Sequence, residues 1–464
     1  MNPDSPSASF RPAGAVAVLG AGITGLTAAW ALREAGSNPV VFEATPRVGG
    51  VIGSIRQGAW LHETGPNSLM EGSPTVSELL GSLGLDSRKL LAGPAARNRY
   101  VVRRGRPLAM PVSPGGFLAT PLFSWRAKAR LLGEPFRGRA APDREESVAE
   151  FTVRRLGREF LDYAVEPLVG GVYAGDPALL SVRHAFPKLY ALERNHGSLI
   201  RGAIALRSRT AGPPGKPLSF PEGLEELPRA IAAALGESVR TNARVRALSR
   251  TRSGWRVAWE GPAGLREEEF SAVVCALPAD ALASLRVDGE TGPRTLASAA
   301  DIVHPPLVSV FTGYRRADVG HALDGFGMLV PRAERRGILG TLFSSTLFPG
   351  RAPEGHVALT TFVGGVRNPD SAGLDDDAVL ELVQRELRAL LDVRGPAVHA
   401  HVCRWARAIP QYNVGFGRFL RLYEEVEAAE PGLFIGGNCR DGISLAACLD
   451  SGRRLAAAVL AAAR

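Results

Sequence analysis

The stretch Val16-Ala-Val-Leu-Gly20-Ala-Gly22-Ile-Thr-Gly25-Leu26 sets three glycines between an apolar run and a helical pattern. Each glycine has its own role in such a strand-to-helix turn. The first allows the tight turn, the second lets the backbone approach a pyrophosphate, and the third lets the helix pack closely on the sheet. The N-terminal N–H groups of the helix then face the anion. The stretch therefore predicts the first turn of a dinucleotide-binding βαβ unit rather than an ordinary tight turn.

The residues that follow complete the predicted unit. Leu26–Leu32 has helical spacing, and Pro39-Val-Val-Phe-Glu43 is typical of a second strand. Glu43 lies 23 residues after Gly20. This is close to the distance at which an acidic residue reaches the ribose hydroxyls of a nucleotide on the first βα turn. We therefore expect Glu43 to contact the ribose.

A second glycine cluster favours FAD over a nicotinamide cofactor. This cluster comprises Arg47-Val-Gly49-Gly50 and, further on, Thr64-Gly65-Pro66. Near the C-terminus, Gly436-Gly437-Asn438 is typical of a loop that closes over a flavin. A nicotinamide dehydrogenase does not need these loops, whereas FAD is long and passes under several of them. Arg47 can neutralise the pyrophosphate through charge-assisted hydrogen bonds; the alternative is a solvated surface arginine.

Composition limits the class of protein. The chain has 464 residues, of which 45% are hydrophobic, so we expect two or three domains. Its four cysteines form no CxxC pair, so neither a metal site nor a disulfide framework is indicated, and a reducing compartment is expected. The first residues lack the basic segment of a signal peptide, and no apolar run is long enough to cross a bilayer. We therefore expect a cytoplasmic location, either free or peripheral on the cytoplasmic membrane face.

Positive charge is concentrated in one segment. The formal net charge is +9, and Arg88–Arg139 holds twelve Lys and Arg residues against the single acid Glu134. The apolar and aromatic stretch Pro111–Trp125 lies among these charges. Such a pattern can hold a protein on an anionic membrane face or guide an acidic substrate; a solvated surface with a small local core is the alternative. No nucleic-acid-binding motif is recognisable, so nucleic acid is not an expected partner.

Three regions are predicted along the chain. Residues 14–85, 215–290 and 405–464 form a discontinuous FAD-binding domain, in which Val239–Leu248 and Trp255–Trp259 alternate as strands. Residues 86–210 form a helical insert, with apolar residues at helical spacing in Glu146–Leu156, and residues 291–404 form a substrate-binding sheet domain. The predicted fold class is α/β: a Rossmann-like FAD-binding domain, a mixed-sheet substrate domain and an inserted helical region that is a candidate membrane-facing element.

Four further motifs narrow the family. They are Gly170-Gly-Val-Tyr-Ala-Gly175, Phe220-Pro-Glu-Gly-Leu224, Gly325-Phe-Gly-Met-Leu-Val-Pro331 and Ile409-Pro-Gln-Tyr412. With them the chain, from Val16 to Leu460, resembles the protoporphyrinogen oxidases within the amine-oxidase-like flavoprotein superfamily. The resemblance implies a non-covalent FAD and an oxygen-dependent step of haem biosynthesis. Protoporphyrinogen IX would lose six electrons in three two-electron steps to give protoporphyrin IX, and dioxygen would become hydrogen peroxide.

The resemblance also assigns site residues. Those implied to line FAD are Gly20, Gly22, Gly25, Glu43, Arg47, Gly49, Gly50, Gly65, Val245, Trp405, Gly437, Asn438, Ile443 and Ser444. Arg99 would meet a substrate propionate, and the macrocycle would lie between apolar groups, because a flat dicarboxylated ring needs apolar faces and a cation at its acidic edge. Those groups are Leu168, Gly171, Phe326 and Leu329. Without the resemblance, core positions and an exposed salt bridge would be the preferred interpretations. No side chain is assigned as an essential base.

Two positions depart from the family pattern. Phe416 stands where the family often has histidine, so any polar contact of that histidine is missing. Asp441 stands where a small or neutral residue is usual, and its carboxylate would either shift the flavin potential or face solvent.

Other functions remain open at this point. Coproporphyrinogen III oxidase performs the same oxidation on a four-carboxylate ring, and the basic segment does not exclude it. An amine oxidase or a carotenoid desaturase is more distant, and no Ser-Gly-Gly-Cys element of a covalent-flavin amine oxidase precedes Trp405. A binding protein of the GDP-dissociation-inhibitor kind would keep the glycines without flavin. The family resemblance is also compatible with a homodimer and with hand-off of the product to the next haem-pathway enzyme.

Overall fold

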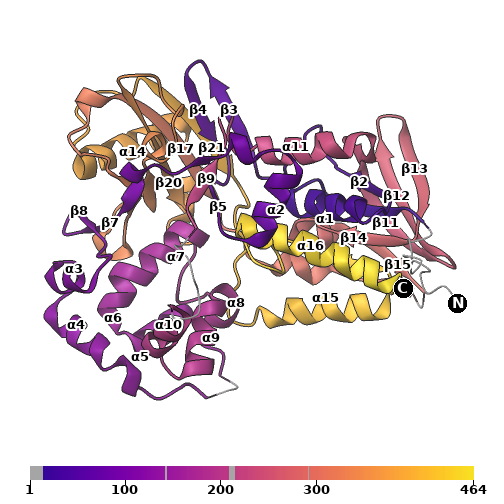
Figure 1. The fold of residues 1–464 in the computed structure, drawn as a ribbon, viewed down its shortest axis with the longest axis horizontal. Coiled ribbons are helices and arrows are strands. Elements are labelled where there is room, and N and C mark those ends of the chain that lie inside the picture. The colour runs from indigo at the N-terminus through magenta and orange to yellow at the C-terminus, as the bar shows by residue number, and fades with distance from the viewer. Residues whose placement is uncertain (1–13, 142–143, 208–214, 291, 464) are drawn as a thin grey trace, which may run out of the picture.

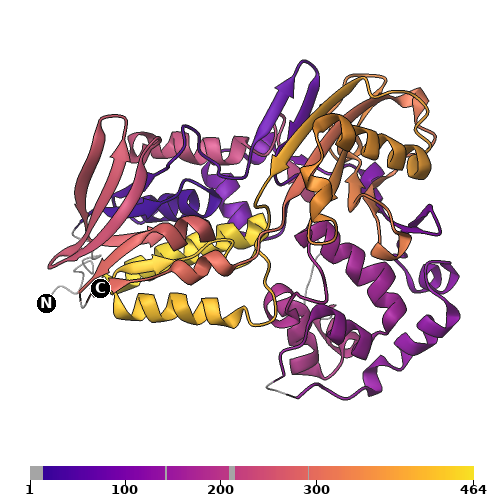
Figure 2. The same ribbon diagram turned by 180° about the vertical axis from the view of Figure 1, so that it is seen from behind.

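The computed structural model describes residues 14–463 apart from 142–143, 208–214 and 291. The thirteen N-terminal residues, on which the predicted location partly rests, lie outside the described part. Figure 1 shows a nucleotide lobe at the end that holds both termini, a large sheet at the opposite upper end and a group of helices below that sheet. Figure 2 shows the same arrangement from behind.

A five-stranded sheet forms the centre of the nucleotide lobe. Its order is β10 (Val239–Arg240), β2 (Pro39–Phe42), β1 (Val16–Leu19), β14 (Ala272–Cys275) and β22 (Leu433–Ile435). Every neighbouring pair is parallel, and β1 and β14 are buried along their whole length, as apolar strands covered on both faces are expected to be. The predicted strand, helix and second strand are confirmed.

Two long helices pack together beside this sheet. α1 (Ile23–Glu34) follows the glycine turn, and α16 (Leu445–Ala462) is the last helix. A Cβ atom added at Gly452 of α16 would lie 2.6 Å from the carbonyl oxygen of Thr24 in α1. The two backbones therefore approach more closely than any side chain at position 452 would allow.

A second five-stranded sheet extends the nucleotide lobe. Its order is β13 (Gly264–Phe270), β12 (Gly254–Gly261), β11 (Arg244–Thr251), β15 (Arg286–Gly289) and β16 (Gly292–Arg294). The run predicted as one strand over Val239–Leu248 is divided between the two sheets. Asn242 has φ of +52°, a left-handed conformation that turns the chain between β10 and β11.

A mixed seven-stranded sheet forms the other lobe. Its order is β21 (His399–Trp405), β17 (Leu307–Arg315), β20 (His356–Gly364), β19 (Gly340–Leu342), β18 (Gly325–Leu329), β7 (Asn98–Arg103) and β8 (Arg106–Ala109). Only the β18–β7 pair is parallel among the described strands of this sheet. One face packs on α14 (Asp376–Leu391) through an apolar cluster that includes Val310, Leu359 and Leu387.

Part of the segment predicted to be helical joins this sheet. β7 and β8 lie within 86–210, and Arg104 and Gly105 between them both have positive φ, as a two-residue hairpin turn requires. The turn was not apparent from the sequence because arginine is an unusual residue at its first central position.

The rest of that segment is largely helical. Its helices are α3 (Pro114–Ala119), α4 (Trp125–Leu132), α5 (Val148–Arg155), α6 (Arg158–Phe160), α7 (Glu166–Tyr173), α8 (Val182–Ala185), α9 (Pro187–His196) and α10 (Leu199–Arg207). The helix predicted over Glu146–Leu156 is confirmed as α5. It begins with a capping box in which Ser147 and Glu150 each bond the other's backbone N–H.

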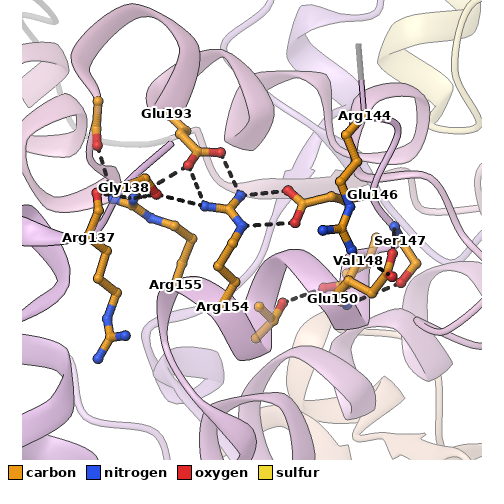
Figure 3. A network of polar contacts seen from close by, with 12 residues as sticks. Arg137, Gly138, Arg144, Glu146, Ser147, Val148, Glu150, Arg154, Arg155 and Glu193 are labelled. Atoms are coloured by element: carbon orange, nitrogen blue, oxygen red, sulfur yellow. Dashed lines mark hydrogen bonds and ion pairs between the residues drawn. The ribbon is translucent and has the colours of Figure 1, made fainter. Parts of the chain in front are cut away.

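Buried charge holds these helices together (Figure 3). Arg154 lies between Glu146 and Glu193 and donates to both carboxylates, at 2.6 and 2.7 Å. Arg155 and Glu134 form an ion pair in which neither side chain has any exposed surface. Glu134 also accepts from Ser198 and from the first N–H groups of α10. Carboxylates thus join α5 to α9 and α10.

Further helices and strands pack around these sheets. They are α2 (Pro74–Ser82), α11 (Glu226–Leu235), α12 (Ala279–Ser284), α13 (Ser344–Leu347), α15 (Gly417–Ala429), the hairpin β3 (Ser54–Gln57) and β4 (Trp60–Glu63), and the small sheet of β5 (Leu69–Met70), β9 (Pro217–Ser219) and β6 (Leu90–Leu91). Among the described residues no helix has the length and apolar character needed to span a membrane.

Candidate active site

The first glycine turn leaves an open helix N-terminus. α1 begins after Gly22 with no side-chain cap and no acidic residue in its first turn, so its first N–H groups are free to bind an anion. A Cβ at Gly25 would lie 2.0 Å from the Gly20 carbonyl oxygen, whereas a Cβ at Gly22 would meet nothing within 4 Å. Gly25 is thus required by helix packing, and the space beside Gly22 is available to a ligand.

The second glycine loop folds directly onto the first. Gly49 N–H donates to the Ala21 carbonyl oxygen at 2.8 Å, and Gly22 and Gly49 form a parallel bridge. A Cβ at Gly50 would lie 3.4 Å from the Gly22 Cα. The two loops together form a cradle of bare backbone.

Glu43 and Arg47 border this cradle. One Glu43 oxygen accepts from Ala21 N–H at 2.9 Å and the other from Thr45 N–H at 2.9 Å. A carboxylate has about four acceptor sites, so it can still accept from ribose hydroxyls. Arg47 is exposed and differs from the expected geometry: its guanidinium donates to the carbonyl oxygens of Gly50 and Ile52 and so closes its own loop. Its charge nevertheless lies beside the diglycine.

Gly65 and Trp405 come together from distant parts of the chain. Trp405, the last residue of β21, donates its indole N–H to the Thr64 carbonyl oxygen at 2.7 Å. A Cβ at Gly65 would lie 2.0 Å from the Val51 carbonyl oxygen, so this loop packs tightly on the one that follows the diglycine. Val245 lies in β11, two residues after Ala243, whose N–H donates to the Glu43 carbonyl oxygen.

The C-terminal loop reaches the first turn of α1. Gly437 is buried with φ of +110°, and a Cβ there would lie 3.8 Å from the Thr24 hydroxyl. Asn438 and Ile443 are partly buried, and Ser444 caps α16 by accepting from Ala447 N–H. The N-termini of α1 and α16 therefore bound one region, with the glycine loops between them. Backbone donors, glycine-lined space and an acid at one end fit a flavin dinucleotide.

The residues assigned to substrate form two contacting pairs. The Arg99 guanidinium lies 5.5 Å from the ring centroid of Phe326, on the parallel neighbouring strand. A Cβ at Gly171 of α7 would lie 2.5 Å from a Leu329 methyl carbon, so α7 packs against β18 through that glycine. Leu168 is exposed on α7. The structure thus brings the cation on β7 together with apolar groups on β18, and α7 adjoins the same strand.

Both departures from the family pattern are accounted for by contacts. Phe416 is buried and stacks on the Tyr412 ring at a centroid separation of 4.2 Å. The Asp441 carboxylate accepts from Ser451, from Gly437 N–H and from Arg454. Asp441 therefore does not simply face solvent, as one interpretation proposed, but fastens the C-terminal loop to α16.

A row of imidazoles beside this site was not predicted. β4 and β21 meet through the pairs Trp60 with His399, at 5.2 Å between ring centroids, and His62 with His401, at 4.2 Å. Burial, reinforced by the neighbouring histidines, lowers the pKa of His62 to about 3. The alternation of His399, His401 and Trp405 along the sequence was the available signal, because alternate residues of a strand share a face. Among the described residues no cluster of His, Cys, Asp and Glu is arranged to hold a metal ion.

The fold and the glycine cradle define the class: a dinucleotide-binding oxidoreductase with a separate substrate sheet. The family model for flavin-containing amine oxidoreductases matches residues 23–460. The chain therefore belongs to the flavin-containing amine oxidoreductase family, in the branch that contains the protoporphyrinogen oxidases. The predicted α/β fold class and FAD cofactor are confirmed by this membership, and the membrane-facing role of the helical region stays a prediction.

Individual relatives support that placement. The mitochondrial protoporphyrinogen oxidase of Nicotiana tabacum is 34% identical, and the alignment covers 97% of this chain and 96% of the relative. The coproporphyrinogen III oxidase of Bacillus subtilis is 27% identical, with 94% and 96% covered. A solved structure from Exiguobacterium sp. 255-15, provisionally named a protoporphyrinogen oxidase, has a TM-score of 0.78 at 22% identity, with 97% of this chain and 99% of that chain covered.

Proposed function

We propose that this protein is an oxygen-dependent oxidase of haem biosynthesis that converts protoporphyrinogen IX to protoporphyrin IX. The observation that carries the proposal is the juxtaposition of Arg99 with Phe326 at one strand pair, beside α7, in a chain 34% identical to a protoporphyrinogen oxidase. A cation next to apolar groups suits a flat macrocycle with acidic side chains.

The chain's own residues would hold the cofactor by its backbone. The N–H groups at the start of α1, with Gly22 and Gly50, would bind the pyrophosphate, and Glu43 would accept from the ribose. The Gly437–Ser444 loop and Trp405 would border the flavin ring system. When bound, FAD supplies the two-electron redox chemistry and passes electrons to dioxygen. The protein's part is to orient the ring and exclude water.

The substrate residues would act by position rather than by proton transfer. Arg99 would fix a propionate by a charge-assisted hydrogen bond, and Phe326 and Leu168 would contact the macrocycle. Gly171 and Leu329 pack against each other, so they would border the macrocycle on the same side rather than enclose it from two faces. No titratable side chain among these residues is placed as a base. The loss of a pyrrolic proton is therefore assigned to water or backbone groups.

Coproporphyrinogen III is the second candidate substrate. The 27% identity to the Bacillus subtilis enzyme favours it, as do the exposed arginines 97, 104 and 106 around Arg99, which would suit two additional carboxylates. The test is porphyrin fluorescence formed in air by the purified yellow protein, with both porphyrinogens offered in parallel. A higher kcat/KM for protoporphyrinogen IX is expected. A preference for coproporphyrinogen III would replace the first proposal, and no product from either would overturn both.

Peripheral membrane contact is proposed for the end of the helical region. Leu118, Trp125, Leu132 and Phe136 are all more than half exposed on or beside α3 and α4, whereas Phe117 and Phe123 pack into a local core with Phe160. The aromatic stretch thus serves both as core and as exposed surface. Exposed apolar groups beside arginines favour an anionic bilayer.

Flotation with liposomes tests the membrane contact. The protein is expected to bind vesicles that contain anionic lipid, and the double variant Trp125→Ser/Leu132→Ser should bind them more weakly. No binding to vesicles with or without anionic lipid would refute this proposal. A cytoplasmic location is proposed on the four free cysteines. A homodimer and a hand-off to the next haem-pathway enzyme stay predictions.

A further inference from the structure

The segment that follows β21 joins the two halves of the candidate site. The Gln411 side-chain amide donates to the Tyr173 carbonyl oxygen at 2.8 Å, at the C-terminal end of α7. The next residue, Tyr412, donates its hydroxyl to the Asn438 carbonyl oxygen and accepts from Gly442 N–H at 2.9 Å. Two consecutive side chains therefore reach the helix assigned to substrate and the loop assigned to the flavin.

Both side chains are held without freedom to turn. Gln411 is 2% and Tyr412 3% exposed. Their backbone is fixed as well, since Gln411 N–H donates to Val303 and the Tyr412 carbonyl oxygen accepts from Ser181 N–H. The Tyr412 ring is stacked on Phe416, which is buried. Burial raises the pKa of Tyr412 well above its usual range, so its hydroxyl keeps the proton that it donates.

The turn that Tyr412 contacts needs an external tie. Gly437 and Gly442 both have positive φ, so the backbone between them is intrinsically permissive. Asp441 and Ser451 fix its first end through Gly437 N–H. The Tyr412 hydroxyl joins the Asn438 carbonyl oxygen, next to that end, to the Gly442 N–H at the far end of the turn. Without the hydroxyl both groups would lose their partner.

We propose that Gln411 and Tyr412 are positioning residues that align the substrate helix α7 and the flavin loop Gly437–Ser444 on one rigid segment. Neither residue needs to touch the reacting atoms. Tyr412 acts through the loop that would border FAD, and Gln411 acts through the end of the helix that carries Leu168 and Gly171. The inference rests on the proposed function in that it places FAD at the loop and porphyrinogen at α7.

Substitution of Tyr412 is predicted to change FAD affinity, and substitution of Gln411 is predicted to change KM. A merely structural role would not separate the two effects. Tyr412→Phe keeps the ring and removes two hydrogen bonds, so FAD should bind about tenfold more weakly when titrated into apoprotein. Its visible absorption envelope should also change. Gln411→Leu should raise KM for the porphyrinogen about fivefold while leaving FAD affinity within about twofold of the parent. Phe416→His, which restores the usual family residue, should retain FAD because it keeps a planar ring against Tyr412.

Controls separate this inference from the cofactor assignment. Tyr314→Phe removes a buried hydroxyl from β17 in the substrate sheet and should alter neither FAD affinity nor KM. Gly22→Ala tests the cradle itself. If Gly22→Ala weakens FAD binding but Tyr412→Phe does not, the positioning role is refuted and the cofactor site stands. If neither variant weakens it, the placement of FAD is wrong. Equal losses of FAD affinity and thermal stability in Tyr412→Phe, Gln411→Leu and Tyr314→Phe would also refute the positioning role.

Discussion

The nucleotide lobe and the helical region solve the same problem, polar groups in a protein interior, by opposite means. In the nucleotide lobe the polar groups are backbone N–H groups at the start of α1, beside the open space left at Gly22, where a Cβ would meet nothing within 4 Å. In the helical region they are full charges, with Arg155 and Glu134 paired beyond the reach of solvent. The nucleotide lobe therefore depends on the absence of a side chain, and the helical region depends on each charged side chain having a partner of opposite charge.

This difference decides which substitutions matter in each region. A methyl group suffices to fill the cradle, whereas the ionic region tolerates changes of volume better than the loss of one partner. A buried ion pair pays a large desolvation penalty, and removing one partner leaves the other charge unpaired. Substitutions in both regions test this comparison.

The largest effect is expected from Arg155→Met. It leaves Glu134 buried without its cation and removes donors to the Arg137, Gly138 and Gly197 carbonyl oxygens. The expected loss is about 3–5 kcal/mol of unfolding free energy, measured by urea denaturation. Arg158→Met, at an exposed pair with Asp162, is the control and should cost no more than about 0.5 kcal/mol. Equal losses in the two variants would show that burial does not control the cost.

Gly22→Ala examines the cradle. The backbone there has ordinary negative φ of −68° and a Cβ meets no neighbour, so the apoprotein should unfold as the parent does. FAD should bind roughly 10- to 100-fold more weakly, because the methyl group would occupy the pyrophosphate position. Apoprotein titration followed by flavin fluorescence measures this. Gly115→Ala, also with open space around it, should leave FAD affinity unchanged. A destabilised apoprotein with normal FAD affinity would contradict the cradle.

His62→Phe tests a third case, a buried histidine that stays neutral. Because burial lowers the pKa of His62 from 6.5 to about 3, the unfolded chain binds a proton that the folded chain does not between these values. The stability that neutral His62 contributes is therefore complete above pH 6.5 and is lost as the pH falls toward 3. Between pH 8 and pH 5 the variant should lose about 2 kcal/mol less than the parent.

Paired denaturation curves at the two pH values give that difference. The partly exposed His356, next to Trp60, offers His356→Phe as the matched control, which should follow the parent. Burial raises the pKa of the neighbouring Glu63 to about 7 against the opposing effect of Arg351. The stability that protonated Glu63 contributes is therefore lost as the pH rises. That contribution is present in parent and variant alike. Identical pH dependence of His62→Phe and the parent would show that His62 is not held neutral.

The smallest effect is expected from Arg99→Ala. Arg99 is exposed and stands over Phe326, so its removal should leave stability unchanged. KM for the porphyrinogen should rise about tenfold, the equivalent of one charge-assisted hydrogen bond, with kcat little altered. Arg252→Ala, at an exposed arginine in the turn between β11 and β12 of the nucleotide lobe, is the control and should keep the parent's KM. Unchanged steady-state kinetics in Arg99→Ala would remove the assignment of Arg99 to the substrate edge.

Sequence reasoning succeeded where local chemistry dictates geometry. The glycine turn, both strands of the first unit and α5 were predictable because glycine spacing, apolar runs and helical periodicity act over a few residues. The hairpin of β7 and β8 was missed because Arg104 takes a left-handed conformation without the usual residue preference. The division of Val239–Leu248 at Asn242 was missed because the alternation of polar and apolar residues continues on both sides of the turn, although the two parts join different sheets.

Contacts between distant residues could not be derived from pattern alone. Nothing local to Arg154 shows that Glu193, 39 positions away, will be its partner. The same holds for the Asp441 carboxylate, whose contacts with Ser451 and Arg454 no local pattern indicates. Its predicted effect on the flavin potential stays a prediction. The Tyr412 contacts join a motif that had been noted only as a family landmark to the loop carrying Gly437. Such pairings depend on the tertiary structure that they stabilise.

The interrupted order of the nucleotide sheet has a consequence for synthesis of the chain. β1 pairs with β14, and β22 and α16 arrive only after residue 432. During translation the first glycine turn is therefore synthesised early, but its sheet is complete only after nearly the whole chain has been synthesised. Pairings of such long sequence separation fold slowly and leave strand edges exposed meanwhile. With FAD at the proposed cradle, cofactor binding would therefore be a late event that requires synthesis of the last helix.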